Sequence, residues 1–174
     1  MRWAIRVLVV TAMTLASGGD AFGQGAPTSV RPEEDAVREL INTGMERSAT
    51  LRGLINRLNA TDLVVYVRFS QCAGGVHACL VWATPTSDHR RVLIKVDRFA
   101  GSPNSLTALL AHELQHACEV AAEHRVVDAA SFEKAFAERG LKSARGYETR
   151  EAGEVGRRVM AELTQPPNTR TARR

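Results

Sequence analysis

Apolar residues recur at helical spacing through residues 33–58. Pro32 and the acidic residues after it suit a first helical turn, because proline fixes a helical φ and acids favour the positive end of a helix. The apolar positions that follow are Val37, Leu40, Ile41, Met45, Leu51, Leu54, Ile55 and Leu58. Their spacing predicts a helical stretch that Gly44 or Gly53 bends or divides.

Three segments with strand character come next. Leu63–Phe69 is rich in β-branched and aromatic residues, and its alternate positions give one apolar face. Ala78–Ala83 and Arg91–Val96 follow after polar segments. The connections are short, which favours antiparallel pairing. Residues 73–75 have turn chemistry, so the first two segments are predicted to form a hairpin.

The second half of the sequence is mainly helical. Ser102 can cap a helix and Pro103 suits its first position, which predicts a helix from there to about residue 123. Two more helices are expected over 131–139 and from about 147 to 163. Helices and strands in separate runs predict an α+β fold in a single domain over 33–164, with a small antiparallel or mixed sheet.

The first residues are typical of a signal peptide. Arg2 and Arg6 precede an apolar run of about ten residues, too short to span a bilayer. Ala21 and Gly23 then place small residues where signal peptidase cleaves, which predicts cleavage after residue 23. The alternative is an uncleaved amphipathic helix. We expect a secreted or periplasmic protein with no stable membrane span after processing.

Composition and charge fit an ordinary globular domain of 174 residues, 44% of them hydrophobic. The net charge is +4, and it is too small and dispersed for nucleic-acid binding. Residues 24–32 are predicted to be a flexible linker. Residues 165–174 contain the only cluster of basic residues, and we expect a disordered tail there.

Cysteine positions agree with export. Cys72 and Cys79 flank the turn of the predicted hairpin, so an oxidising compartment would let them form a disulfide. The alternatives are two free thiols, or a metal site with His77 whose spacing matches no common zinc knuckle. Cys118 has no predicted partner.

The motif His112-Glu113-Leu114-Gln115-His116 lies on the long central helix. Residues four apart on a helix share a face, so His112 and His116 can bind one metal ion. Glu113 lies beside them, where it can take a proton from a water on the metal. This combination predicts a Zn²⁺ cofactor, because zinc lowers the pKa of bound water to about 7.

The motif resembles that of the zincin metallopeptidases, specifically the gluzincin branch. The resemblance implies an active-site helix beside a small twisted sheet, with a further zinc ligand on a later helix. It makes His112 and His116 zinc ligands and Glu113 the catalytic carboxylate. The extended metzincin pattern is absent, because this chain has Glu119 and Ala122 where that pattern has glycine and a ligand.

The third ligand implied by the resemblance is a glutamate near the start of the last helix. We expect Glu148 in this role, with Glu151 as the alternative, and both in the first turn of that helix. Glu119 lies on the face of the motif histidines, where it is more suited to orienting His116 by a hydrogen bond. Glu123 is expected to be solvated at the end of its helix.

Together these features predict a small exported zinc metallopeptidase of bacterial type. Its partner would be a peptide or protein substrate, lying as an added strand along a sheet edge beside the motif helix. The alternatives are a non-catalytic, zinc-stabilised envelope protein and a binding module with an accidental motif. The sequence indicates no particular oligomeric state.

Overall fold

The computed structural model describes residues 28–83, 89–139, 141–143 and 146–166. The helices of this part are α1 (Asp35–Arg47), α2 (Ala49–Asn59), α3 (Pro103–Ala122), α4 (Ala129–Arg139) and α5 (Arg150–Thr164). The strands are β1 (Val30–Pro32), β2 (Leu63–Phe69), β3 (Ala78–Ala83), β4 (Arg90–Val96), β5 (Leu141–Ser143) and β6 (Gly146–Glu148). The predicted signal peptide over 1–23 and most of the predicted tail lie outside the described residues.

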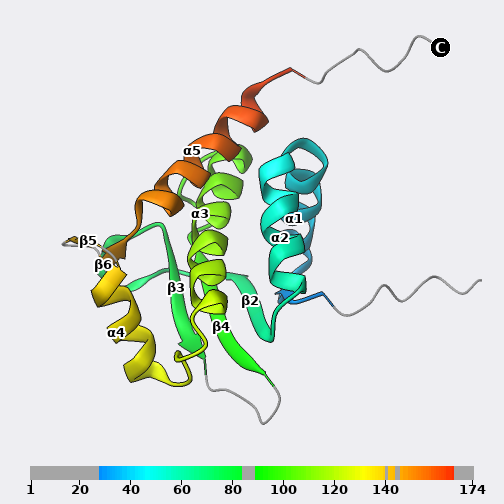
Figure 1. The fold of residues 1–174 in the computed structure, drawn as a ribbon. Coiled ribbons are helices and arrows are strands. Elements are labelled where there is room, and N and C mark those ends of the chain that lie inside the picture. Colours follow the sequence, from blue (N-terminus) through cyan, green and yellow to red (C-terminus); the bar gives the residue numbers. More distant parts are fainter. Residues whose placement is uncertain (1–27, 84–88, 140, 144–145, 167–174) are drawn as a thin grey trace, which may run out of the picture.

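The α+β class and the small mixed sheet are confirmed. Four strands are hydrogen-bonded in the order β1-β2-β4-β3, and β5 pairs with β6 in a separate two-stranded sheet. β1, β2 and β4 run parallel, whereas β3 is antiparallel to β4 and forms one edge. Figure 1 shows α3 lying across the sheet, with the α1–α2 pair on one flank and α5 on the other.

The predicted hairpin between Leu63–Phe69 and Ala78–Ala83, which are β2 and β3, is wrong. β4 lies between β2 and β3, and it is parallel to β2. Burial accounts for the order, because alternate residues of β4 are fully buried while every residue of β3 is only partly buried. The most apolar strands therefore take the centre and β3 the edge. The disulfide Cys72–Cys79 is present, but it joins the segment after β2 to the edge strand.

The N-terminal boundary of the folded domain also differs from the prediction. Residues 30–32, which end the predicted linker, form strand β1 and pair with β2 in the register Val30↔Val65. Val30 is 4% exposed and belongs to the core. The strand covers the outer edge of β2, whose backbone groups would otherwise lack partners.

The first helical stretch divides at Ser48, not at either glycine. The Ser48 hydroxyl accepts a hydrogen bond from the backbone N–H of Leu51 and so caps α2. Gly44 has a different role, because a Cβ there would lie 2.7 Å from side-chain carbons of both Leu51 and Thr107. The missing side chain lets α1 pack closely against α3.

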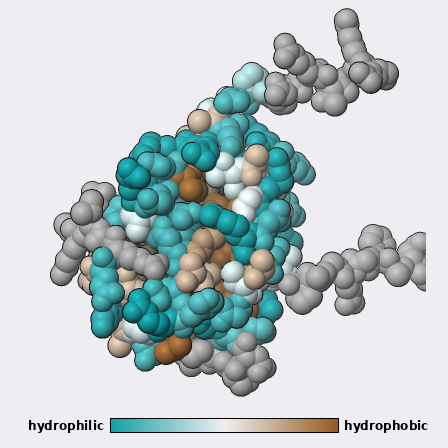
Figure 2. Space-filling model, in the orientation of Figure 1, coloured by the Kyte–Doolittle hydropathy of each residue, from teal (hydrophilic) through white to brown (hydrophobic). Residues whose placement is uncertain are grey.

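α3 is the central element of the core. Leu110, Ala111, Leu114 and Ala117 are fully buried on it, beneath α5 and against the sheet. The exterior differs sharply, since hydrophilic residues cover most of the face shown in Figure 2 and apolar residues emerge only in small patches. Across the described residues, no helix combines the length and hydropathy that crossing a membrane requires.

The C-terminal end of α3 is held by Arg90, the first residue of β4. Its guanidinium is 9% exposed and donates to both carboxylate oxygens of Asp62, at 2.9 and 2.7 Å. It also donates to the backbone carbonyls of Val120, Ala121 and Glu123 at 2.9–3.1 Å. The last carbonyls of a helix lack partners within it, so Arg90 satisfies them and joins α3 to the sheet.

Replacing Arg90 with methionine should lower the free energy of unfolding by about 3 kcal/mol, because the change leaves Asp62 and several carbonyls without their donor. Urea denaturation measures this effect. Arg98→Met is the matched control, since Arg98 is half-exposed and 3.9 Å from Glu34, and it should cost at most about 1 kcal/mol. Equal losses in the two variants would contradict the anchoring role.

Candidate metal centre

The two motif histidines lie one turn apart on α3 and face the same space. Their ring centroids are 4.9 Å apart and the rings meet edge to face, with 78° between their planes. The side chain of His112 is 21% exposed, whereas that of His116 is 5% exposed. The helical spacing therefore brings the two imidazoles together as predicted, at the wall of a cavity.

Glu148 joins them from the end of β6. One carboxylate oxygen, Oε1, lies 3.3 Å from Nε2 of His112 and 4.0 Å from Nε2 of His116. The three potential ligand atoms lie within 4.8 Å of one another, which is compatible with one metal ion. The expected location of Glu148 was wrong, because it precedes α5 instead of lying in its first turn.

The alternative third ligands point elsewhere. Glu119 accepts a hydrogen bond at 3.0 Å from Nδ1 of His116, in the orienting role that the sequence favoured. Glu151 does lie in the first turn of α5, but its side chain is 60% exposed and 3.8 Å from Arg150. Glu123 is not simply solvated, since its carboxylate lies 2.9 Å from the Arg125 guanidinium.

Glu119 is the hub of a hydrogen-bond network behind His116. The hydroxyl of Thr149 donates to its carboxylate at 2.9 Å, and the side-chain amide of Gln115 donates at 3.1 Å. Gln115 in turn accepts a hydrogen bond at 2.8 Å from Arg57 on α2. Burial opposes the charge of Glu119, but these hydrogen bonds outweigh it and lower its pKa.

The same Thr149 hydroxyl also caps α5 by accepting a hydrogen bond from Ala152. Thr149, which follows Glu148 in the chain, is thereby bonded both to the start of α5 and to Glu119, the hydrogen-bond partner of His116. Sequence patterns suggested no role for Thr149 or Gln115. A threonine directly before a predicted helix is a capping signal, but its second contact depends on tertiary packing.

α5 also supports His112. The imidazole forms a hydrogen bond with the backbone of Ala152. A Cβ at Gly156 would lie 3.5 Å from Cβ of His112 and 3.8 Å from its Nδ1, so α5 passes close to this side chain. His116 is held on its Nδ1 side by Glu119, and both histidines turn Nε2 toward Glu148. In metal sites this second hydrogen bond fixes the tautomer that leaves Nε2 free to coordinate.

The pKa directions of the two histidines differ because their partners differ. Burial lowers the pKa of His112, against the opposing attraction of Glu148. Burial also acts to lower the pKa of His116, but the hydrogen bond with Glu119 and the nearby carboxylates outweigh it and raise the pKa. His116 is therefore the histidine whose proton competes more strongly with a metal ion.

Glu113 is the most deeply buried carboxylate of the site, at 6% exposure. Burial raises the pKa of Glu113 to about 7, although the nearby His116 acts in the opposite direction. Its carboxylate also accepts a backbone hydrogen bond from Leu80 on the edge strand β3. A glutamate with a near-neutral pKa in a cleft is a typical candidate for proton transfer.

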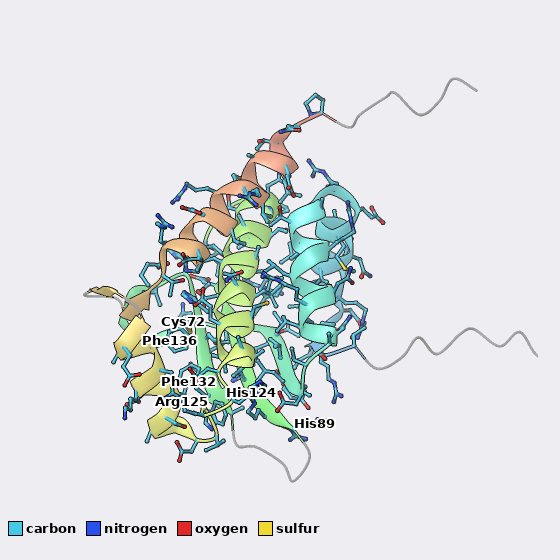
Figure 3. All side chains as sticks on the ribbon, in the orientation of Figure 1. Cys72, His89, His124, Arg125, Phe132 and Phe136 are labelled. Carbon is cyan, nitrogen blue, oxygen red and sulfur yellow. A yellow bond between two sulfur atoms is a disulfide. The ribbon has the colours of Figure 1, made fainter. Side chains whose placement is uncertain are left out.

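A cavity of about 610 Å³ opens over these side chains. Its walls are β3 with the segment before it, α3, Glu148 and the apolar face of α4. Phe132 and Phe136 come from α4, where Figure 3 labels them, and Phe136 stacks edge to face on His116 at 5.4 Å. The sequence did not single out these phenylalanines, although their four-residue spacing marks an apolar helix face.

The remaining histidines do not join the group. Figure 3 places His124 just beyond the end of α3 and His89 at the start of β4, both at the same end of the molecule. Among the described residues, only His112, His116 and Glu148 form a cluster whose geometry could hold a metal ion. This set offers two imidazole nitrogens and one carboxylate oxygen, which suits zinc and related divalent ions.

Comparison with known proteins found no match among family models, curated proteins or solved structures. The resemblance to zincins therefore remains a prediction from the sequence motif. What the structure adds is the contact geometry of the site.

Zinc titration should separate the three acidic residues. Glu148→Ala should abolish measurable binding, because it removes a potential ligand atom. Glu119→Ala should weaken affinity by about 10–100-fold, as loss of a hydrogen bond to a ligand usually does. Glu151→Ala is the matched control and should bind normally. If Glu119→Ala abolishes binding and Glu148→Ala leaves it intact, the ligand set is different.

The buried Glu113 should also make the stability of the metal-free protein depend on pH. Its pKa of about 7 lies above the ordinary 4.5, so the folded state binds more protons between these values and stability falls as pH rises through this window. Glu113→Gln removes the effect. Its advantage over wild type should grow from near zero at pH 4.5 to on the order of 3 kcal/mol at pH 8.

Denaturant unfolding in the presence of a chelator, at several pH values, measures this difference. Glu133→Gln, on the opposite wall of the cavity, serves as the control and should show no such trend. A Glu113→Gln advantage that is the same at pH 5 and pH 8 would contradict the raised pKa.

Proposed function

We propose that this chain is a zinc-dependent peptide hydrolase. The observation that carries the proposal is the convergence of His112, His116 and Glu148 within 4.8 Å beside the buried Glu113. Their cavity of about 610 Å³ is large enough for several residues of a peptide. A purely structural metal site would need neither the adjoining carboxylate nor the open cavity.

The number of protein ligands supports catalysis over a structural role. Structural zinc sites usually have four protein ligands, whereas catalytic sites have three and leave one position open. In the described part of the chain the cluster contains three residues. Glu148 is 49% exposed on the cavity side, so solvent and substrate can reach the centre.

Glu113 would act as the general base and then as the proton donor. A bound Zn²⁺ would lower the pKa of water to about 7 and polarise the substrate carbonyl. Glu113 would accept the proton of the attacking water and return it to the leaving amine. Its buried position keeps the pKa near neutrality, where a carboxyl can perform both transfers.

The edge strand β3 suggests how a peptide would lie. Among the described residues, β3 pairs with a strand on one side only, and the backbone of Leu80 is hydrogen-bonded to Glu113 on the other. The open edge of β3 therefore runs directly beside the proposed base. A peptide added to this edge as an extra strand would carry its backbone past Glu113.

Export remains part of the proposal. The disulfide Cys72–Cys79 suits an oxidising compartment, and it links the wall of the cavity to the segment after β2. Together with the signal-like N-terminus, it supports a secreted or periplasmic site of action. The predicted signal peptide itself is outside the described residues.

Glu113→Gln should bind zinc as wild type does but lose nearly all peptide hydrolysis, because an amide cannot accept the proton of water. Zinc content and cleavage of a mixed peptide library, each measured on the same samples, test both statements. Glu133→Gln lines the same cavity from α4 and should retain activity.

Wild-type cleavage rates in Glu113→Gln would rule out this residue as the base. A zinc-loaded wild type that cleaves no peptide in the library would instead favour the non-catalytic alternative.

A further inference from the structure

A second cavity, of about 500 Å³, adjoins the first. The two cavities share His77, Leu109 and His112, so they meet at a candidate metal ligand. The rest of the second cavity is lined by the N-terminal half of α3 and by α5. Its further lining includes Ala100, Ser105, Gly153, Gly156, Arg157 and Met160.

The direction of β3 indicates which part of a peptide would reach this second cavity. β3 begins at Ala78, next to His77, and runs away from the second cavity toward Ala83. A peptide paired antiparallel to its open edge would run the other way. Past Leu80 and Glu113, its next residues would approach His77. The second cavity is thus placed to receive the residues that follow the scissile bond.

Arg157 is the one arginine or lysine among the lining residues of the second cavity, and no aspartate or glutamate is among them. The two histidines that line it already have carboxylate neighbours, because His77 lies 3.9 Å from Asp97 and His112 lies 3.3 Å from Glu148. Neighbouring Arg150 is paired with Glu151 and Glu154, whereas Arg157 forms no ion pair with any residue that the structure describes. Arg157 is therefore a cation available to a ligand.

The glycines of α5 make room for such a ligand. A Cβ at Gly153 would lie 3.4 Å from Nη1 of Arg157, so the guanidinium lies along the helix above this residue. At Gly156 the helix also lacks a side chain beside His112. The result is a shallow apolar floor with a guanidinium at its margin. A planar guanidinium binds a carboxylate through two parallel hydrogen bonds.

We propose that the second cavity binds the residues after the scissile bond and that Arg157 selects a carboxylate among them. The carboxylate could belong to an aspartate or glutamate side chain or to the free C-terminus of a short peptide. This inference rests on the proposed hydrolase function. It adds a preference that the metal centre alone does not supply.

Matched peptides test the preference. Each pair carries glutamate or glutamine at one of the first three positions after the cleaved bond, and each peptide is made with a free or an amidated C-terminus. Wild type should cleave the carboxylate member with kcat/KM about 10–100-fold higher. If only the peptides with an amidated C-terminus are cleaved more slowly, Arg157 binds the terminal carboxylate. If only the peptides with glutamine in place of glutamate are cleaved more slowly, Arg157 binds the side-chain carboxylate.

Arg157→Gln should bring this ratio close to one. Arg157→Glu should reverse it in favour of lysine at the same position. Arg158→Gln is the matched control, because Arg158 is exposed on the next position of α5 and does not line the cavity. A carboxylate preference that survives in Arg157→Gln, or that is absent from an active wild type, overturns the inference.

Binding separates this inference from the hydrolase proposal. Fluorescence anisotropy of the same labelled peptides on metal-free wild type and Arg157→Gln requires no catalysis. Tighter binding of carboxylate peptides to wild type alone supports the role of Arg157, even if no peptide is cleaved and the hydrolase proposal fails. Equal binding of both peptide types to both proteins, with no cleavage, overturns both proposals.

Discussion

The contact on which the site depends most is the hydrogen bond between Thr149 and Glu119, at 2.9 Å. Glu119 comes from α3 and holds His116, while Thr149 begins α5 and is adjacent to Glu148 in the chain. This contact therefore ties the start of α5 to the support of His116 and to the residue that follows Glu148. A partly buried carboxylate is costly unless it is hydrogen-bonded, and His116, Gln115 and Thr149 together offset that cost.

The remaining constraints act on α3 itself. Arg90 holds its C-terminal end to the sheet, and Gly44 lets α1 pack closely against its first turns. A rigid helix matters here, because the proposed chemistry requires two histidines and Glu113 to keep their positions while a substrate binds. Burial of Glu113 beside β3 reduces stability at neutral pH, and such a cost is common where a group is prepared for proton transfer.

Much of α3 and its motif could be predicted from the sequence because their signals are local. Ser102 and Pro103 begin the helix where capping rules place them, and the spacing of His112 and His116 puts both on one face. The order of the strands was not predictable in this way. The order depends on which strands pair with a neighbour on both edges. These pairings join residues that are distant in sequence.

The third candidate ligand illustrates the same limit. Glu148 and Glu151 both stand near the start of α5, and no local pattern distinguishes them. Their difference arises from the short β5–β6 pair, which ends at Glu148 and directs its side chain toward the histidines. Strands of three residues leave no readable periodicity, as β1 also shows. Arg157 was likewise not singled out, because its importance lies in the cavity around it.

The central claim is that two histidines and one glutamate form an open zinc site. X-ray absorption at the zinc edge of the loaded protein tests it most directly. The account predicts one zinc per chain with two imidazoles and two oxygen ligands, one from Glu148 and one from water, at about 2.0–2.2 Å. A shell that contains sulfur, four protein ligands with no water, or only one imidazole would contradict it.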